Sequence, residues 1–276
     1  MMMKFNHPYH LVTLSPWPLM CSLSLMIFSS GNLLIFTSMF SFMTSLLMLF
    51  LQFKFNLMIL AFILLLMNLY QWWRDIIRES TIQGFHTLIV MKGLQNGMIL
   101  FISSEIMFFI SFFWCYFHMY LSPSINIGMI WYPLNLIVFN PYNIPLLNTL
   151  ILLSSGMTIT YCHYSIMESN YMKSFFSLMM TVILGLIFSY FQYLEYNESF
   201  FCINDSVYGA IFFMLTGFHG FHVILGTIFN FIMLMRFLKK HFSMYHFFGF
   251  EASSWYWHFV DLVWLFLYLL IYWLIY

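Results

Sequence analysis

Long apolar runs with few charged residues follow one another along this 276-residue chain. A helix that crosses a lipid bilayer needs about 20 apolar residues. Five runs have that length, at residues 95–120, 144–166, 172–194, 206–235 and 252–276. The stretch from Trp17 to Trp73 is also apolar almost throughout, with room for two long spans or three short ones. The pattern predicts an all-α membrane protein.

The positions of the Lys and Arg residues decide how many spans the first stretch holds. Basic residues concentrate on the side of a membrane that is not translocated. With two early spans, and seven in all, eight of the nine basic residues share one face: Lys4, Arg74, Arg78, Lys92, Lys173, Arg236, Lys239 and Lys240. Three early spans would place Lys4 opposite the others. We therefore predict seven spans, with the N-terminus inside and the C-terminus outside.

The remaining charges fit this orientation. The ninth basic residue, Lys54, is expected at the outer end of the second span, with its ammonium group reaching the interface. The opposite loops carry no basic residue from 121 to 143, and the next one is predicted to hold Glu195, Glu198 and Asp205. No proline lies inside a predicted span, so the helices should be unbroken, and Pro145 suits the first turn of the fourth.

Composition supports the membrane assignment and excludes several classes. The chain is 63% apolar and 7% charged, with a mean hydropathy of +0.88, whereas soluble domains carry about 25% charged residues. Lys+Arg and Asp+Glu balance at 9 each, which argues against a nucleic-acid partner. The four cysteines are isolated, so neither a disulfide framework nor a thiolate metal site is indicated.

Glu105 is the most conspicuous ionisable residue because it lies near the middle of the third predicted span. Such groups are costly at membrane depth and are often functional. An unpaired carboxylate there should hold a proton for most of the time. Two interpretations stay open: a proton-relay or lipid-facing acid, and a protonated Glu that is hydrogen-bonded to a neighbouring helix.

The third span also carries a seam of small and polar residues at intervals of seven. Its members are Gly97, Ser104, Ser111 and His118. Small residues let two membrane helices approach closely. We therefore expect this seam to pack against another helix.

Polar residues recur inside the last two spans. His219 and His222 lie three apart on one helix face, so they form either a metal pair or, as the missing further ligands favour, interhelical hydrogen bonds. In the seventh span, steps of three, four and three residues place Glu251, Ser254, His258 and Asp261 on one stripe. Lipid would not tolerate that stripe, so we expect it to face protein or a wet cavity, as a proton path or a packing network.

The motifs of several cofactor-dependent proteins are missing from the sequence. The seventh span has no Lys for a retinal Schiff base, and no Gly-rich phosphate loop occurs. From its residues alone, the chain is predicted to be a seven-helix protein with no catalytic residue, metal site or cofactor motif of its own.

Several strings resemble subunit III of mitochondrial cytochrome c oxidases. They occur in order at residues 7–18 (HPYHLVTLSPWP), 70–81 (YQWWRDIIREST), 97–105 (GMILFISSE), 145–149 (PLLNT), 207–209 (VYG), 216–223 (TGFHGFHV), 248–252 (FGFEA) and 255–268 (WYWHFVDLVWLFLY). They are long and specific, and the resemblance covers essentially the whole chain.

The resemblance implies seven helices arranged as two plus five around a lipid-holding cleft. It divides the chain into residues 1–73, with the first two helices, and 74–276, a five-helix bundle. It also implies a multi-pass protein of the mitochondrial inner membrane, with the N-terminus in the matrix and the C-terminus in the intermembrane space. The latter agrees with the orientation predicted from charge.

The implied function is that of a non-catalytic subunit in the complex that reduces O2 to water with electrons from cytochrome c while pumping protons. Haem and copper belong to subunits I and II in this family. The partners are therefore those subunits, supernumerary subunits, and phospholipids of the phosphatidylglycerol, phosphatidylethanolamine or cardiolipin class. The subunit would stabilise subunit I, hold lipids and support proton uptake.

The resemblance also assigns residues. Glu105 matches the buried, carbodiimide-reactive acid of the family. Five residues match positions near bound phospholipid headgroups: Trp73, Arg78, Glu79, His86 and Arg236. The cations among them lie at the inner interface, where they suit a phosphate but also follow from charge placement alone. In one departure, Gln95 stands where the family often has an Arg.

Two other functions remain open at this stage. An autonomous ion or proton transporter would use Glu105, His219, His222 and the stripe of the seventh span, and it would drive flux through liposomes that contain this chain alone. A seven-helix receptor needs a ligand pocket and signalling loops, which the nearly uncharged loops disfavour.

Overall fold

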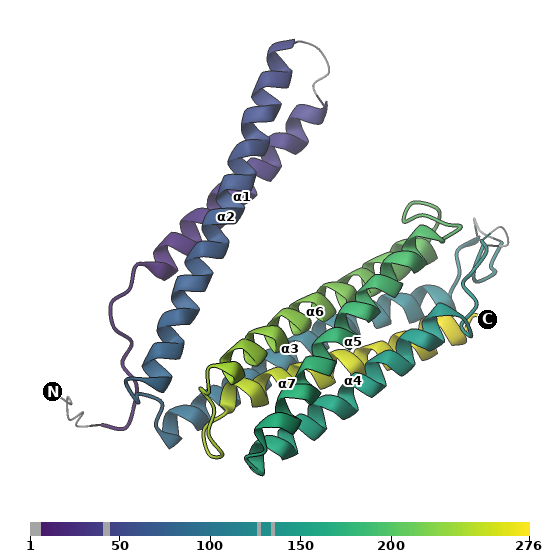
Figure 1. Cartoon of the computed structure of the whole chain (residues 1–276). Helices are drawn as coiled ribbons and strands as arrows, with labels where there is room; N and C mark the ends of the chain where they lie inside the picture. Colours follow the sequence, from purple (N-terminus) through teal and green to yellow (C-terminus); the bar gives the residue numbers. More distant parts are fainter. Residues whose placement is uncertain (1–6, 41–44, 126–127, 134–135) are drawn as a thin grey trace. The chain divides into compact units, whose positions relative to one another are not determined.

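The computed structural model describes residues 7–40, 45–125, 128–133 and 136–276, with the side chains of 33–40 and 45–54 left out. Within those ranges the chain is helical and forms no β-strand (Figure 1). Its α-helices are α1 (Trp17–Phe40), α2 (Ser45–Thr81), α3 (Leu88–Leu121), α4 (Ile144–Met167), α5 (Tyr171–Asn197), α6 (Val207–Leu238) and α7 (Phe248–Leu267). The predicted all-α fold is confirmed.

Six candidate membrane spans are found among the described residues. They lie at Phe55–Thr81, Leu88–Leu121, Ile144–Met167, Tyr171–Asn197, Val207–Leu238 and Phe248–Trp273. The first predicted span coincides with α1, a 24-residue helix whose side chains are described only as far as Asn32. Lys54 lies within α2, but its side chain is outside the described residues.

Helix ends depart from the predicted spans in an informative way. The helix α2 continues past Trp73 through Arg74 and Arg78 to Thr81, because backbone hydrogen bonding does not stop where the apolar run does. Pro145 lies in the first turn of α4, as predicted. The seventh helix is not unbroken: α7 passes into a π-helical turn, η2 (Tyr268–Trp273), which keeps Tyr268, Ile271 and Tyr272 buried.

Contacts divide the chain into two compact units, Met1–Lys92 and Gly93–Tyr276. In the first unit, α1 and α2 pack against each other as a helical hairpin. A Cβ added at Gly31 would lie 3.6 Å from the Cβ of Met58, so the small residue brings the two backbones close together.

The segment before α1 is held to the end of α2 by side chains. The Trp17 indole N–H donates to Asp75 Oδ2 over 2.7 Å, and His10 Nε2 lies 3.0 Å from Glu79 Oε2. Thr87 Oγ1 donates to the carbonyl oxygen of Pro8 over 2.7 Å. These bonds fix residues 8–16, which lie outside any helix, against α2 and the segment that follows it.

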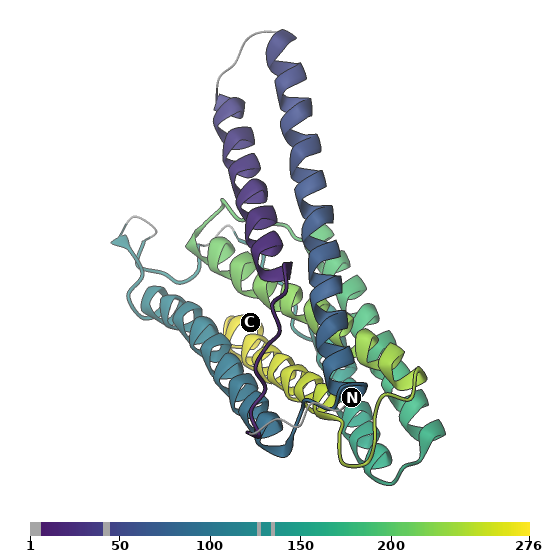
Figure 2. The same ribbon diagram turned by 90° about the vertical axis from the view of Figure 1, so that its left-hand side faces the viewer.

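In the second unit, α4 packs on α5, α5 on α6 and α6 on α7, and α7 closes the set against α4. Figure 2 shows these helices running along one another. The helix α3 joins them through aromatic contacts, with Phe108 and Phe218 ring centroids 4.9 Å apart and Phe109 and Phe259 at 6.0 Å.

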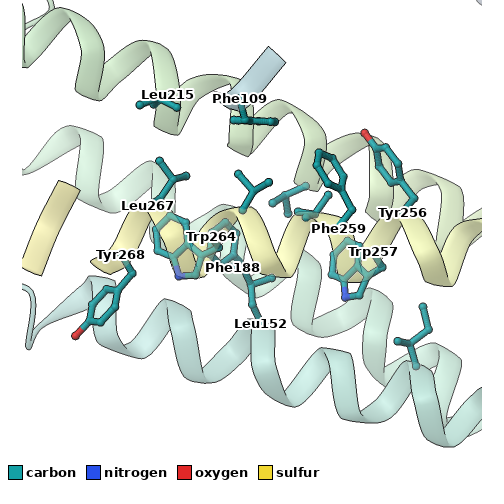
Figure 3. Packing of buried hydrophobic residues seen from close by; sticks show 14 of the residues in the cluster. Phe109, Leu152, Phe188, Leu215, Tyr256, Trp257, Phe259, Trp264, Leu267 and Tyr268 are labelled. Carbon is teal, nitrogen blue, oxygen red and sulfur yellow. The ribbon is translucent and has the colours of Figure 1, made fainter. Parts of the chain in front are cut away.

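The indole of Trp257 contacts α4, α5 and α6. Figure 3 shows this residue among the buried side chains of α7. Trp257 on α7 is fully buried, and its N–H donates to Ser155 Oγ of α4 over 2.9 Å. A Cβ at Gly185 of α5 would lie 2.8 Å from the ring, and one at Gly226 of α6 would also lie at 2.8 Å. The ring therefore occupies a slot that only glycine leaves open on two helices.

The predicted packing of the seam on α3 is wrong for the helices of this unit. Gly97, Ser104, Ser111 and His118 are all exposed, and no atom lies within 4 Å of a Cβ added at Gly97. The two serines donate to carbonyl oxygens of their own helix, at Phe101 and Phe108. Spacing places residues on one face of a helix but does not choose which face meets a neighbour.

Replacing Gly226 with Ala should destabilise the protein, since the new methyl group collides with the Trp257 ring. Overpacking of this kind costs about 1–3 kcal/mol. The matched control is Gly220→Ala on the same helix, where no atom lies within 4 Å of an added Cβ. The thermal midpoint in detergent should fall for Gly226→Ala but not for Gly220→Ala. Equal falls in both variants would show that the Trp257 ring does not require glycine at position 226.

Candidate functional site

Glu105 and His222 form a hydrogen-bonded pair between α3 and α6. His222 Nε2 lies 2.9 Å from Glu105 Oε2. His222 Nδ1 lies 2.6 Å from the carbonyl oxygen of Phe218, which only accepts, so Nδ1 must carry a hydrogen and donate. The histidine side chain is 9% exposed and that of Glu105 is 24% exposed.

The bond to Phe218 limits the protonation states of the pair. With Nδ1 protonated, Nε2 either accepts the O–H of a neutral Glu105 or, in an imidazolium, donates to its carboxylate. Both states are neutral overall and share one proton along the 2.9 Å contact. Of the two interpretations left open for Glu105, this contact favours a hydrogen bond to a neighbouring helix. The histidine that provides it lies on α6, so the sequence of α3 cannot reveal it.

His219 uses a different partner from His222. Its Nε2 lies 3.2 Å from the carbonyl oxygen of Val260 on α7, and its ring packs against Phe188 and Trp264. The two histidines therefore do not converge on a common point. Across the described parts of the chain, no group of three or more His, Cys, Asp or Glu side chains is arranged to hold a metal ion.

The polar stripe of α7 faces the helices around it along most of its length. Glu251 Oε2 accepts from Gln95 Nε2 of α3 over 3.2 Å. Asp261 is buried, and a Cβ at Gly156 of α4 would lie 2.8 Å from its Oδ2. His258 Nδ1 lies 3.9 Å from that oxygen, and its side chain is 40% exposed.

Four of the residues predicted to contact lipid lie in the last turns of α2 and just beyond it. Trp73 and Arg78 are exposed, whereas Glu79 is hydrogen-bonded to His10. The ring of His86 lies 6.1 Å from that of His10. Glu79 therefore helps to anchor the N-terminal segment. Trp73 and Arg78 remain exposed, the first amphipathic and the second basic.

Arg236, the fifth of these residues, lies in the second unit near the end of α6. Its guanidinium carbon is 4.8 Å from the centre of the Phe242 ring, and Nη1 lies 3.8 Å from Met233 Sδ. A Cβ at Gly249 would collide with Nη1. Within the described ranges, Arg236 forms no salt bridge with a carboxylate, and its Nε has no hydrogen-bond partner.

Glu195 was expected in a loop on the outer side, but it lies inside α5 and is fully buried. The Tyr272 hydroxyl donates to its Oε1 over 2.6 Å. The sequence predicts a loop here because two further acidic residues, Glu198 and Asp205, follow closely. The helical spacing from Gln192 to Glu195 was the one available signal that both share the buried face.

Comparison with known proteins gives one consistent match. The family described as cytochrome c oxidase subunit III matches residues 7–276. The chain is 51% identical over 268 residues to cytochrome c oxidase subunit 3 of Drosophila melanogaster, covering 97% of each chain. The protein of the same name from Anopheles quadrimaculatus is 53% identical with the same coverage. That of Pisaster ochraceus is 51% identical over 274 residues, covering 98% of this chain and 99% of the relative.

Glu105→Gln should leave folding intact, because an amide N–H can donate to His222 Nε2 as the O–H of a neutral acid does. Glu105→Leu leaves that buried nitrogen without a partner, at a cost of about 1–3 kcal/mol. Yield and thermal midpoint of the purified protein are the measurements. If Glu105→Gln lost as much folded protein as Glu105→Leu, a neutral hydrogen-bond donor at position 105 would not be enough to keep the pair with His222.

Proposed function

The chain belongs to the cytochrome c oxidase subunit III family, and we propose that it is an accessory core subunit of mitochondrial cytochrome c oxidase without redox centres of its own. The main support is that the chain is 51% identical to proteins of this name over 97–98% of its length. In this role the subunit stabilises the catalytic subunit and belongs to the complex that reduces O2 to water with electrons from cytochrome c. Haem and copper are held by subunits I and II.

The proposed location is the mitochondrial inner membrane, with the N-terminus in the matrix and the C-terminus in the intermembrane space. The candidate spans support a multi-pass protein, and the one-sided basic residues support the orientation. The division into residues 1–73 and 74–276, two helices and five around a lipid-holding cleft, is part of the same proposal.

Arg236 is the residue best suited to a phospholipid headgroup in the second unit. Its guanidinium is held by packing on Phe242 rather than by an acid, which leaves its charge for a phosphate. Nearby, burial and the positive charges of Arg236 and Lys239 lower the pKa of His241. That end of α6 therefore presents a positive field to an anionic headgroup.

In the first unit, the proposed headgroup contacts are Trp73, Arg78, Glu79 and His86. Exposed Trp and Arg side chains at a membrane interface suit glycerol backbones and phosphates. Glu79 would act through its bond to His10, which fixes the neighbouring segment. The lipids would be of the phosphatidylglycerol, phosphatidylethanolamine or cardiolipin class.

Glu105 is proposed to support proton uptake through the proton that it shares with His222. The interhelical contacts of His219, Glu251 and Asp261 are proposed to hold α6 and α7 in place around that pair. An autonomous proton transporter would use the same residues, but the family match over residues 7–276 favours a subunit.

Membership of the oxidase predicts co-migration of the chain with a complex that contains haem and copper. After mild detergent extraction and a native gel, the band that contains this chain should show Soret absorbance. The isolated chain should show none. A chain that migrates only apart from any haem-containing complex, or that binds haem by itself, would contradict the proposal.

Arg236→Ala should reduce the anionic phospholipid retained by the purified complex, because the phosphate loses its cationic partner. Lys240→Ala is the matched control, since it removes an exposed cation a few residues away. Mass spectrometry of extracted lipids gives the measurement. Unchanged lipid content in the Arg236 variant, or equal losses in both variants, would count against the headgroup assignment.

A further inference from the structure

Buried polar side chains gather where the end of α5 meets the π-helical turn η2. Glu195 is fully buried, and Tyr272 of η2 is 3% exposed. The Tyr272 hydroxyl donates to Glu195 Oε1 over 2.6 Å. In Figure 1 the C-terminal end of the chain and the connection from α5 to α6 lie at the same end of the bundle, which is where this contact forms.

Three polar atoms beside this contact are buried and unused. Glu195 Oε2 and both polar atoms of the Gln192 amide have no hydrogen-bond partner among the residues that the structure describes. Gln192 is 5% exposed. The two residues are three apart in α5 and therefore lie on the same face of the helix.

The chemistry of these atoms is complementary. No Lys, Arg or His of the described chain forms a salt bridge with Glu195, and an isolated buried carboxylate is very costly. A neutral Glu195 carries an O–H, which needs an acceptor, while the Gln192 amide offers one acceptor and two donors.

Neighbouring hydroxyls are already engaged elsewhere. The Tyr196 hydroxyl donates to Thr216 Oγ1 of α6 over 2.7 Å, and Thr216 Oγ1 donates to the carbonyl oxygen of Phe212, also over 2.7 Å. Their hydrogens are therefore not available to the atoms left over on Glu195 and Gln192.

We propose that Gln192, Glu195 and the turn that carries Tyr272 form an internal water-binding site. Glu195 is a neutral acid there and donates its O–H from Oε2 to the water. The water in turn donates to Gln192 Oε1. Buried waters typically make about three hydrogen bonds to polar groups that are otherwise unsatisfied.

Such a water would bridge Glu195 and Gln192 along α5, beside the direct Tyr272 bond that links α5 to η2. π-helical turns inside α-helices often occur at functional positions. Here the turn delivers a hydroxyl to a buried acid, and the water completes the polar contact. The site shares no residue with the Glu105 pair or the proposed headgroup contacts, and its existence does not depend on them.

The test is a cryo-EM map of the intact purified oxidase at a resolution that shows ordered water. The wild type should show a density peak within hydrogen-bond distance of both Glu195 Oε2 and the Gln192 amide. Gln192→Met keeps the length of the side chain but removes its polar atoms, so the peak should disappear. Tyr193→Phe, the matched control, removes an exposed hydroxyl of the same helix and should retain the peak.

Two results would overturn the proposal. One is a wild-type map in which no peak occurs and the two side chains bond to each other or to other protein groups. The other is a peak that persists unchanged in Gln192→Met. If that variant does not assemble, the wild-type map alone decides.

Discussion

The contact of Trp257 with three neighbouring helices is the interaction on which the second unit depends. In a bilayer, helices gain little from the hydrophobic effect and associate through close packing and hydrogen bonds. Trp257 supplies both, since its ring fills the slot beside Gly185 and Gly226 while its N–H bonds to Ser155. One residue of α7 thereby fixes the positions of α4, α5 and α6.

With those helices in place, polar groups on separate segments come together in pairs. Glu105 meets His222, Gln95 meets Glu251, and Tyr272 meets Glu195. The interhelical hydrogen bonds therefore depend on the same helix packing that forms the core.

The sequence predicted the helical fold and the start of α4 at Pro145, because apolar length and proline chemistry act locally. It also anticipated that Glu251 and Asp261 would face protein, since lipid excludes them. It could not predict the partner of Glu105, the burial of Glu195 or the outward face of the Gly97 seam. Those features depend on which helices are neighbours and how each is rotated, and hydropathy along one chain contains neither quantity.

A double-mutant cycle on Gly226→Ala and Trp257→Phe tests the slot most directly. The smaller phenyl ring leaves room for the added methyl group, so the double variant should lose clearly less stability than the sum of the two single variants. Residues in contact show such coupling, and independent residues do not. Additive losses in the thermal midpoint of the purified protein would show that the Trp257 ring and Gly226 do not share one space.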